Sequence, residues 1–259
     1  MVFKNLDSTH NYGYQYSICT LMTDETQYRE MMQSFIEAGF DSTLCEFLIV
    51  DNTQENKFEA YRAVNRFLQE AQGRYIIFCH QDILINYDQE HVLKKRIAQL
   101  DELDPRWGIA GNAGAIDLYQ IAMVITQNKK LIRKGKFPAK VISLDENFLL
   151  IKAEANLAVS ADLSGFHLYG TDLCLIADCM GWNSYVIDFN ITHKSSGKMD
   201  PSFYEISEQL QKKYQRFFRG RYIKTTITRF YLGSKWISWF MNLAFIKSIV
   251  RLYYKSRSN

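Results

Sequence analysis

The chain alternates short apolar runs with longer stretches in which apolar residues recur every three or four positions. The apolar runs that predict buried strands occupy residues 16–22, 47–50 and 75–79. Between them, residues 25–38 and 58–71 have helical spacing, and the glycines that follow, Gly39 and Gly73, predict helix ends. This order of elements is typical of an α/β domain with a mostly parallel central sheet flanked by helices.

The rest of the chain continues this mixture of helices and strands. A helix is expected over residues 88–103, with Asp88 as its N-terminal cap. Residues 107–114 predict a short strand that runs into a glycine-rich turn, and residues 116–137 fit either a hairpin or a mobile loop. The later pattern predicts strand, turn and strand over 141–154, a helix over 169–182 ending at Gly181, a strand over 184–194 and helical structure from Pro201 onward.

Composition indicates a folded protein of a reducing compartment. The 259 residues are 47% hydrophobic with only three prolines, which suits one α/β domain with a tail. The five cysteines form no CxxC pair, which argues against a zinc ribbon or a disulfide framework. The N-terminus has no apolar signal core, and no stretch reaches the roughly 18 apolar residues of a spanning helix. We therefore expect a cytoplasmic protein.

Charge is divided unevenly along the chain. Residues 209–259 contain twelve Lys or Arg and no Asp or Glu, so residues 1–208 carry −9 within a total of +3. This predicts a main domain over 1–208 and a basic helical segment over 209–259 that meets an anionic partner. Residues 236–246 are uncharged and rich in aromatics, which predicts an interfacial helix on the inner face of the cell membrane. Packing on the main domain or a homodimer seam would use the same apolar face.

Polar side chains follow three of the predicted strands at the point where each strand ends. The residues concerned are Asp51, Asn52, His80, Gln81, Asp82 and His193. In a doubly wound sheet the carboxyl ends of the strands open into the binding crevice. We therefore expect these side chains to line a ligand site.

Six short motifs follow one another along the chain. They are YSICTLMTDE, FLIVDNT, GRYIIFCHQDI, LDENFLLIKAE, GFHLYGTDLCL and ITHKSSG. In this order they resemble the family 2 glycosyltransferases of the GT-A fold, over residues 16–197, and in particular a subgroup with HQD where many members carry Asp-x-Asp. The resemblance implies a GT-A nucleotide-diphospho-sugar transferase fold and the transfer of a sugar from a nucleotide diphosphate to an acceptor hydroxyl.

The resemblance also implies a divalent metal. The second acid of Asp-x-Asp contacts the metal most directly, and here that position is Asp82. His80 replaces the first acid, and His193 matches a late metal or pyrophosphate contact, although either histidine would otherwise be a hydrogen-bonded structural residue. A cation at this place neutralises charge that develops on the leaving diphosphate. Imidazole ligands favour Mn²⁺ over Mg²⁺.

Further donor contacts are implied by the same resemblance. Asp51 matches the acid that hydrogen-bonds the nucleobase, and a carboxylate there selects a base with an N–H donor, which favours a UDP-linked sugar. The other residues expected on the donor side are Thr20, Thr23, Asn52, Gln81 and Gly111. Gly111 would let the backbone approach the donor sugar, or would form a tight turn.

On the acceptor side, Asp172 matches the catalytic base of the family, with Thr171 where many relatives have an acid. An inverting transfer needs a carboxylate within hydrogen-bond reach of the acceptor hydroxyl. Asp172 also lies at the start of a predicted helix, where its alternative role is an N-terminal cap. Asp145 and Glu146 are expected either to line the acceptor site or to form a solvated turn.

Together these features predict a metal-dependent, inverting glycosyltransferase of surface polysaccharide or glycolipid synthesis, with a saccharide or lipid-linked acceptor. The alternative is a non-catalytic protein that binds nucleotide or nucleic acid through its basic segment; for the enzyme no nucleic-acid partner is expected. A nucleotidyltransferase is disfavoured because TDETQ, rather than a glycine-rich basic loop, follows the first strand. The sequence also has no GxSxG or GxxxxGK[ST] motif.

Overall fold

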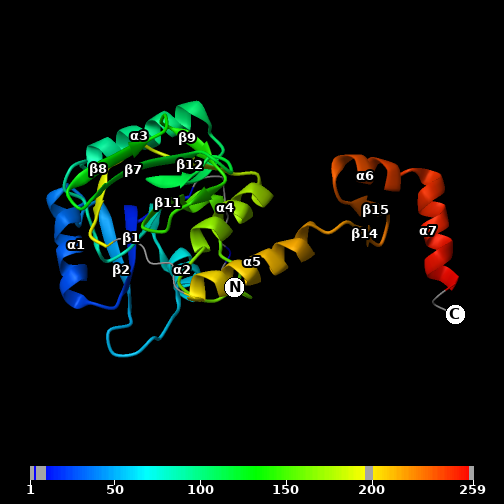
Figure 1. Cartoon of the computed structure of the whole chain (residues 1–259), viewed down its shortest axis with the longest axis horizontal. Coiled ribbons are helices and arrows are strands. Elements are labelled where there is room, and N and C mark those ends of the chain that lie inside the picture. Colours follow the sequence, from blue (N-terminus) through cyan, green and yellow to red (C-terminus); the bar gives the residue numbers. More distant parts are fainter. Residues whose placement is uncertain (1–2, 4–9, 196–200, 257–259) are drawn as a thin grey trace. The chain divides into compact units, whose positions relative to one another are not determined.

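The computed structural model of the chain describes residues 3, 10–195 and 201–256. The chain divides into two compact units, Met1–Ser207 and Glu208–Asn259. Figure 1 shows the helices and strands of both units.

The first unit is built on a seven-stranded mixed sheet. From one edge to the other it consists of β2 (Cys45–Asp51), β1 (Tyr14–Met22), β3 (Gly73–Cys79), β11 (Phe148–Lys152), β5 (Trp107–Gly111), β12 (Asn183–Val186) and β9 (Ala139–Val141). β1 pairs in parallel with β2 and β3, and β12 pairs in parallel with β5. β11 runs antiparallel between β3 and β5, so β3 and β5 share one direction. The predicted α/β fold with a mostly parallel sheet is confirmed.

Helices pack on both faces of this sheet. They are α1 (Glu25–Glu37), α2 (Ala60–Glu70), α3 (Glu90–Leu103) and α4 (Tyr169–Met180), and a 3₁₀ turn, η1 (Ala153–Ala155), follows β11. Phe35 of α1 shares one apolar core with Ile77 of β3. On the opposite face, Phe78 of β3 contacts the rings of Phe67 and Tyr169 at centroid distances of 5.7 and 5.3 Å. Because consecutive strand residues point to opposite faces, β3 is buried from both sides.

A smaller second sheet accompanies the central one. It consists of β10 (Ser143–Leu144), β6 (Ala113–Ala115), β7 (Ile121–Gln127), β13 (Ile191–His193) and β4 (Ile83–Leu84), and β8 (Lys130–Lys134) pairs with β7. Of the two expectations for residues 116–137, the hairpin is correct, since β7 and β8 form one. The single strand predicted over 184–194 is two strands, β12 in the central sheet and β13 in the second.

Local chemistry explains where α1 begins and ends. Asp24 caps its start, since its side chain accepts the Gln27 N–H, and the chain leaves the helix through Gly39 with φ +93°. The prediction that Gly73 ends a helix is wrong, because Gly73 is the first residue of β3. Its backbone lies so close to β1 that a Cβ would come within 2.4 Å of the Ser17 nitrogen. Glycine is needed there for close strand packing rather than for a turn.

The predicted cap of α3 also differs. Gln89, not Asp88, is the N-cap residue, and it makes no side-chain capping bond. The Asp88 carboxylate instead accepts the main-chain N–H of Asn190 at 2.6 Å. Asp88 therefore fixes the segment that leads into β13.

The second unit contains the end of α5 (Pro201–Phe218), a hairpin of β14 (Arg221–Lys224) and β15 (Arg229–Leu232), and the helices α6 (Lys235–Met241) and α7 (Ala244–Ser256). The hairpin corrects the expectation of helical structure throughout this segment. The interfacial helix predicted over 236–246 is also interrupted, because the Asn242 side chain bonds the main-chain N–H and C=O of Tyr231. Among the described residues, no helix has both the length and the apolar character needed to span a bilayer.

Candidate functional site

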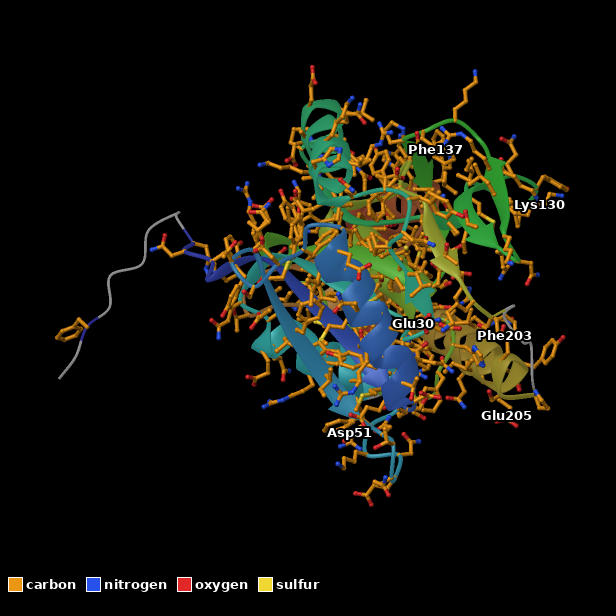
Figure 2. All side chains as sticks on the ribbon, turned by 90° about the vertical axis from the view of Figure 1, so that its left-hand side faces the viewer. Glu30, Asp51, Lys130, Phe137, Phe203 and Glu205 are labelled. Atoms are coloured by element: carbon orange, nitrogen blue, oxygen red, sulfur yellow. The ribbon has the colours of Figure 1, made fainter. Side chains whose placement is uncertain are left out.

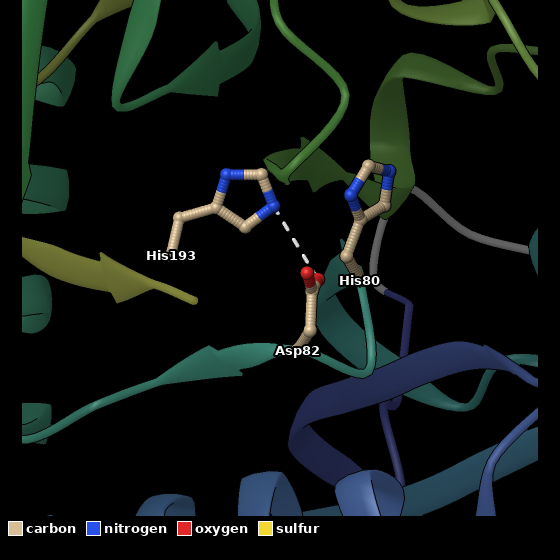
Figure 3. A group of neighbouring side chains, drawn as sticks. All are labelled: His80, Asp82 and His193. Carbon is tan, nitrogen blue, oxygen red and sulfur yellow. Dashed lines mark ion pairs between the residues drawn. The ribbon is translucent and has the colours of Figure 1, made fainter. Parts of the chain in front are cut away.

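A short antiparallel pairing brings two distant segments together at the carboxyl end of β3. The residues between β3 and β4 are His80, Gln81 and Asp82. β13 pairs with β4 so that His193 lies opposite Ile83, and the Lys194 N–H donates to the Asp82 carbonyl at 3.0 Å. This register brings the side chains of Asp82 and His193 next to each other (Figure 3).

His80, Asp82 and His193 form a compact cluster. Their candidate ligand atoms all lie within 4.8 Å of one another, and His193 Nε2 is 3.3 Å from Asp82 Oδ1. Figure 3 shows one ring nitrogen of His80 turned toward the other two residues. Two imidazole nitrogens and one carboxylate oxygen form a donor set that suits a divalent transition metal.

The protonation states of the cluster suit a cation. Burial would raise the pKa of Asp82, but hydrogen bonds from His193 and Ser195 outweigh burial and hold this pKa below its ordinary value. Burial lowers the pKa of His80, and the nearby His193 lowers it further. Near neutral pH Asp82 is therefore ionised and His80 is neutral, the forms in which both side chains bind metal.

The cluster lies in a cleft of about 650 Å³, with walls from the ends of β1 and β3, from β7, and from the loops before β11 and α4. A volume of this order accommodates a small organic ligand. Of the predicted site residues, the cleft brings together Thr23, His80, Gln81, Asp82, Asp145, Glu146 and His193.

Gln81 fixes the loop that follows β1. Its Oε1 accepts the main-chain N–H groups of Thr23 and Asp24 at 2.8 and 3.0 Å. Its Nε2 donates to the Thr23 hydroxyl at 2.8 Å. The cleft wall at Thr23 is therefore held in place from the end of β3.

Three of the expected donor-side residues are buried and do not line the cleft. Thr20 is 1% exposed, and its hydroxyl lies 3.5 Å from the Cys79 sulfur. Asn52 accepts the N–H groups of residues 57 and 58 and so shapes the loop after β2. Gly111 is buried at the end of β5, where a Cβ would come within 3.0 Å of the Phe148 carbonyl. These residues support the fold around the site rather than line the cleft.

Asp51 also lies outside the cleft lining. Figure 2 shows it at the end of β2, beside the loop that follows. Its Oδ1 accepts the N–H and the hydroxyl of Thr53 at 2.9 and 2.6 Å. These bonds lower the pKa of Asp51, so its carboxylate is ionised.

Asp172, the residue expected to be the base, is not among the residues that line the cleft. Its side chain is 0% exposed, and its carboxylate accepts both the N–H and the hydroxyl of Ser160, at 2.6 and 2.8 Å. A catalytic base has to contact the acceptor hydroxyl, whereas this carboxylate ties the loop around Ser160 to the first turn of α4. Nor is it the helix cap, since Leu168 occupies the N-cap position.

Glu146 is an acidic residue that does line the cleft. Its Oε1 accepts the N–H of Gly170, in the first turn of α4, at 3.2 Å. A Cβ at Gly170 would come within 2.6 Å of the Leu144 carbonyl, so glycine lets α4 approach this loop. Burial, together with the neighbouring Asp145, raises the pKa of Glu146 to about 8. Asp145 itself is exposed and accepts the Asn147 N–H.

Among the cleft residues that sequence reasoning missed are His167 and Tyr169. Both belong to the motif GFHLYGTDLCL, but the resemblance drew attention only to its aspartate. Leu168 between them has φ +63°, a conformation uncommon for a leucine, and the pattern of apolar residues gives no sign of it. Residues 196–200, which include the last two residues of the motif ITHKSSG, lie outside the described residues.

Solved structures with the GT-A fold share this architecture at low sequence identity. Mannosyltransferase PcManGT from Pyrobaculum calidifontis, in complex with GDP-Man and Mn²⁺, is 13% identical, with a TM-score of 0.51 over 81% of this chain and 66% of that chain. GalNAc-T7, with UDP, GalNAc and Mn²⁺, is 12% identical, with a TM-score of 0.52 over 72% and 45%. TarS from S. aureus is 15% identical, with a TM-score of 0.50 over 77% and 39%. The chain spans about two thirds of the first protein and less than half of the other two. The GT-A fold is confirmed.

No family model matches the sequence. A protein of Fuscovulum blasticum described as ATP synthase subunits region ORF 6 is 35% identical over 234 residues, which cover 85% of this chain and 92% of that protein. The chain belongs to the family of this protein.

Asp172→Asn tests whether Asp172 holds the loop at Ser160 or acts as a base. An amide offers one oxygen in place of two, so a buried donor of Ser160 loses its acceptor at a cost of about 1–3 kcal/mol. We expect a lower melting temperature and an unchanged kcat per folded molecule. Asp178→Asn, on the exposed end of the same helix, is the control. A variant that keeps its melting temperature but loses turnover would restore Asp172 as the base.

Proposed function

We propose that this chain is a metal-dependent glycosyltransferase that moves a sugar from a nucleotide diphosphate to an acceptor hydroxyl. The observation that carries the proposal is the cluster of His80, Asp82 and His193, with ligand atoms within 4.8 Å, in a cleft at the carboxyl end of β3. The GT-A fold supports it, and so do PcManGT and GalNAc-T7, whose complexes contain a nucleotide or nucleotide sugar together with Mn²⁺. The HQD motif favours a family 2-like subgroup.

His80, Asp82 and His193 are the residues that would hold the metal. Two imidazoles in a set of three donors favour Mn²⁺ over Mg²⁺, which prefers oxygen ligands and retained water. When bound there, a divalent cation supplies the positive charge that stabilises the leaving diphosphate. Asp82 contributes its own charge to the binding of the cation, while the β4–β13 pairing fixes the separation of Asp82 from His193.

The donor side of the proposal uses the edge of the cleft at Thr23 and Gln81. Asp51 is ionised and lies at the end of β2, which pairs in parallel with β1. It is proposed to accept an N–H of the nucleobase, which favours uracil. Thr20, Asn52 and Gly111 are assigned a supporting role, because each is buried and none lines the cleft.

For the acceptor side we propose Glu146 as the catalytic base. Its carboxyl group borders the same cleft as the metal cluster, whereas the carboxylate of Asp172 is bound by Ser160. Inverting transfer requires the base to take the proton of the attacking hydroxyl. Asp145, which is exposed, is proposed to line the acceptor site on the side nearest the solvent.

Asp82→Asn tests the metal assignment. An amide keeps the size of the side chain but removes its charge, so we expect metal-dependent donor turnover to fall by at least about 10²-fold. The fold should persist, since the Lys194 hydrogen bond goes to the main chain of Asp82. Turnover is measured with UDP- and GDP-sugars, with and without added Mn²⁺, against the Asp178→Asn control. Normal turnover by Asp82→Asn, or donor binding without any turnover in the parent protein, would contradict the proposal.

Glu146→Gln tests the base. We expect kcat to fall by at least about 10²-fold while the KM for the donor changes little. A base acts only when ionised, and the pKa of Glu146 is raised from 4.5 to about 8 by burial and Asp145. The kcat of the parent protein should therefore still rise with pH across the neutral range. The exposed Glu154→Gln serves as the control, and full activity of Glu146→Gln would refute the assignment.

We further propose that the second unit docks on the anionic inner face of the cell membrane, where a lipid-linked acceptor for polysaccharide or glycolipid synthesis would be reached. Trp236 and Trp239 of α6 are 81% and 66% exposed. On α7, Phe245, Ile249 and Leu252 are exposed at helical spacing. Exposed aromatic and apolar residues beside basic ones are typical of interfacial binding.

The charge of this unit supports an anionic partner. A hollow of about 330 Å³ is lined by Lys224, Arg229, Lys247 and Arg251, together with hydroxyl-bearing residues. Lys224 and Arg229 lie directly opposite each other in the hairpin, and Lys247 and Arg251 are one turn apart on α7. Like charges in both arrangements repel, and residues 209–259 contain no acid to offset them. Lipid phosphates would offset this repulsion.

Vesicle flotation tests the docking of the full chain. We expect binding to phosphatidylcholine vesicles only when phosphatidylserine is included, and weaker binding as salt increases. Trp236→Ser with Trp239→Ser, and separately Lys247→Ser with Arg251→Ser, should each reduce binding. Leu118→Ser, which alters a side chain 89% exposed in the first unit, is the matched control. Equal flotation of all variants, or concentration-dependent dimers without flotation, would refute membrane docking.

A further inference from the structure

We propose that Tyr169 is a positioning residue that fixes His80 in the tautomer whose Nδ1 lone pair faces the metal cluster. This inference rests on the proposed function for the metal but not on the identity of the sugar. It gives a role to Tyr169, a cleft residue to which the family resemblance assigns none.

Two successive hydrogen bonds join His80, Tyr169 and Glu146. His80 Nε2 lies 3.2 Å from the Tyr169 hydroxyl, and this hydroxyl lies 3.4 Å from the main-chain carbonyl of Glu146. Figure 3 shows the two ring nitrogens of His80 on different sides, with the one next to Cγ facing Asp82 and His193. The nitrogen that meets Tyr169 is therefore not the one that meets the cluster.

The Glu146 carbonyl, which is the last acceptor in this pair of hydrogen bonds, sets the direction of both. A carbonyl oxygen can only accept, so Tyr169 donates its single hydroxyl hydrogen to Glu146. The hydroxyl oxygen then has lone pairs left, and it accepts from His80 only if Nε2 carries a hydrogen. A neutral imidazole has one N–H, so Nδ1 is left unprotonated and able to bind a cation.

The Tyr169 hydroxyl can impose these hydrogen-bond directions, because the Tyr169 side chain cannot easily move. It is 2% exposed, and its ring makes edge contacts with Phe78 and Tyr61 at centroid distances of 5.3 and 6.3 Å. The main chain is fixed on both sides, by Leu168 at φ +63° and by the Gly170 N–H bond to Glu146. A strained residue beside a functional side chain is common where geometry has to be precise.

A partner on the far nitrogen of a metal-binding histidine fixes the ring and raises the basicity of the near nitrogen. Loss of such a partner typically lowers metal affinity about 10–100-fold. Tyr169→Phe removes only the hydroxyl and keeps the ring that packs against Phe78.

The first test reads the tautomer directly and needs neither metal nor donor. Long-range ¹H–¹⁵N correlation spectra of the metal-free, histidine-labelled full chain at near-neutral pH show which ring nitrogen carries hydrogen, and His80→Asn assigns the signal. We expect His80 to be protonated on Nε2 in the parent protein and to become a mixture of tautomers in Tyr169→Phe. A hydrogen on Nδ1 in the parent protein, or an unchanged spectrum in Tyr169→Phe, overturns the inference.

The second test measures Mn²⁺ affinity by electron paramagnetic resonance. We expect Tyr169→Phe to bind Mn²⁺ about 10–100-fold more weakly. Tyr185→Phe is the matched control, because it removes another buried hydroxyl, one that donates to Asp104 on the β12 side of the sheet. Equal affinity of Tyr169→Phe and the parent overturns the positioning role. No Mn²⁺ binding by the parent refutes the proposed function instead, while the spectra still decide the tautomer.

Discussion

The pairing of β13 with β4 is the interaction on which the candidate site depends. It is short, since Thr192 and His193 pair with Leu84 and Ile83 and no other described residues take part, yet it sets His193 beside Asp82. Neighbouring hydrogen bonds add to the few that this short pairing makes. The Asp88 carboxylate binds the Asn190 N–H, and the Thr192 hydroxyl donates to Asn86 at 2.8 Å. Two residues far apart in sequence are thereby held at a separation that one cation can bridge.

Several polar residues around the cleft combine a structural and a chemical task. Gln81 borders the cleft and also holds Thr23 and Asp24 through three hydrogen bonds. Glu146 binds the first turn of α4 through its side chain and receives the Tyr169 hydroxyl through its main chain. The start of α4, the loop before β11 and His80 are thus linked. A substitution in one of these linked segments is therefore expected to alter the metal cluster even where the substituted residue does not contact it. For this reason the proposed variants remove single polar groups.

Much of the fold could be predicted because β3 and its neighbours are continuous apolar runs, a pattern that buried parallel strands impose. His80 and Asp82 could be found for a related reason, since they directly follow such a run. His193 was found in the same way, at the end of a predicted strand. The two-residue strand Ile83–Leu84 has no periodicity to detect, so the pairing that sets His193 beside Asp82 was not predicted. Gly73 was misread because glycine serves helix ends and close strand contacts alike. The sequence could not show the surroundings of Asp172, because an acid in a first helical turn has the same pattern whether it faces a cleft or Ser160.

The central claim is that one divalent cation binds among His80, Asp82 and His193. Anomalous diffraction at the manganese edge, from crystals of the full chain grown with Mn²⁺ and UDP, tests it most directly. We expect one strong peak in the cleft, at coordination distance from Asp82 and from His80 Nδ1 and His193 Nε2, and no such peak in Asp82→Asn crystals. A peak away from these three side chains, or none in the parent protein, would contradict it.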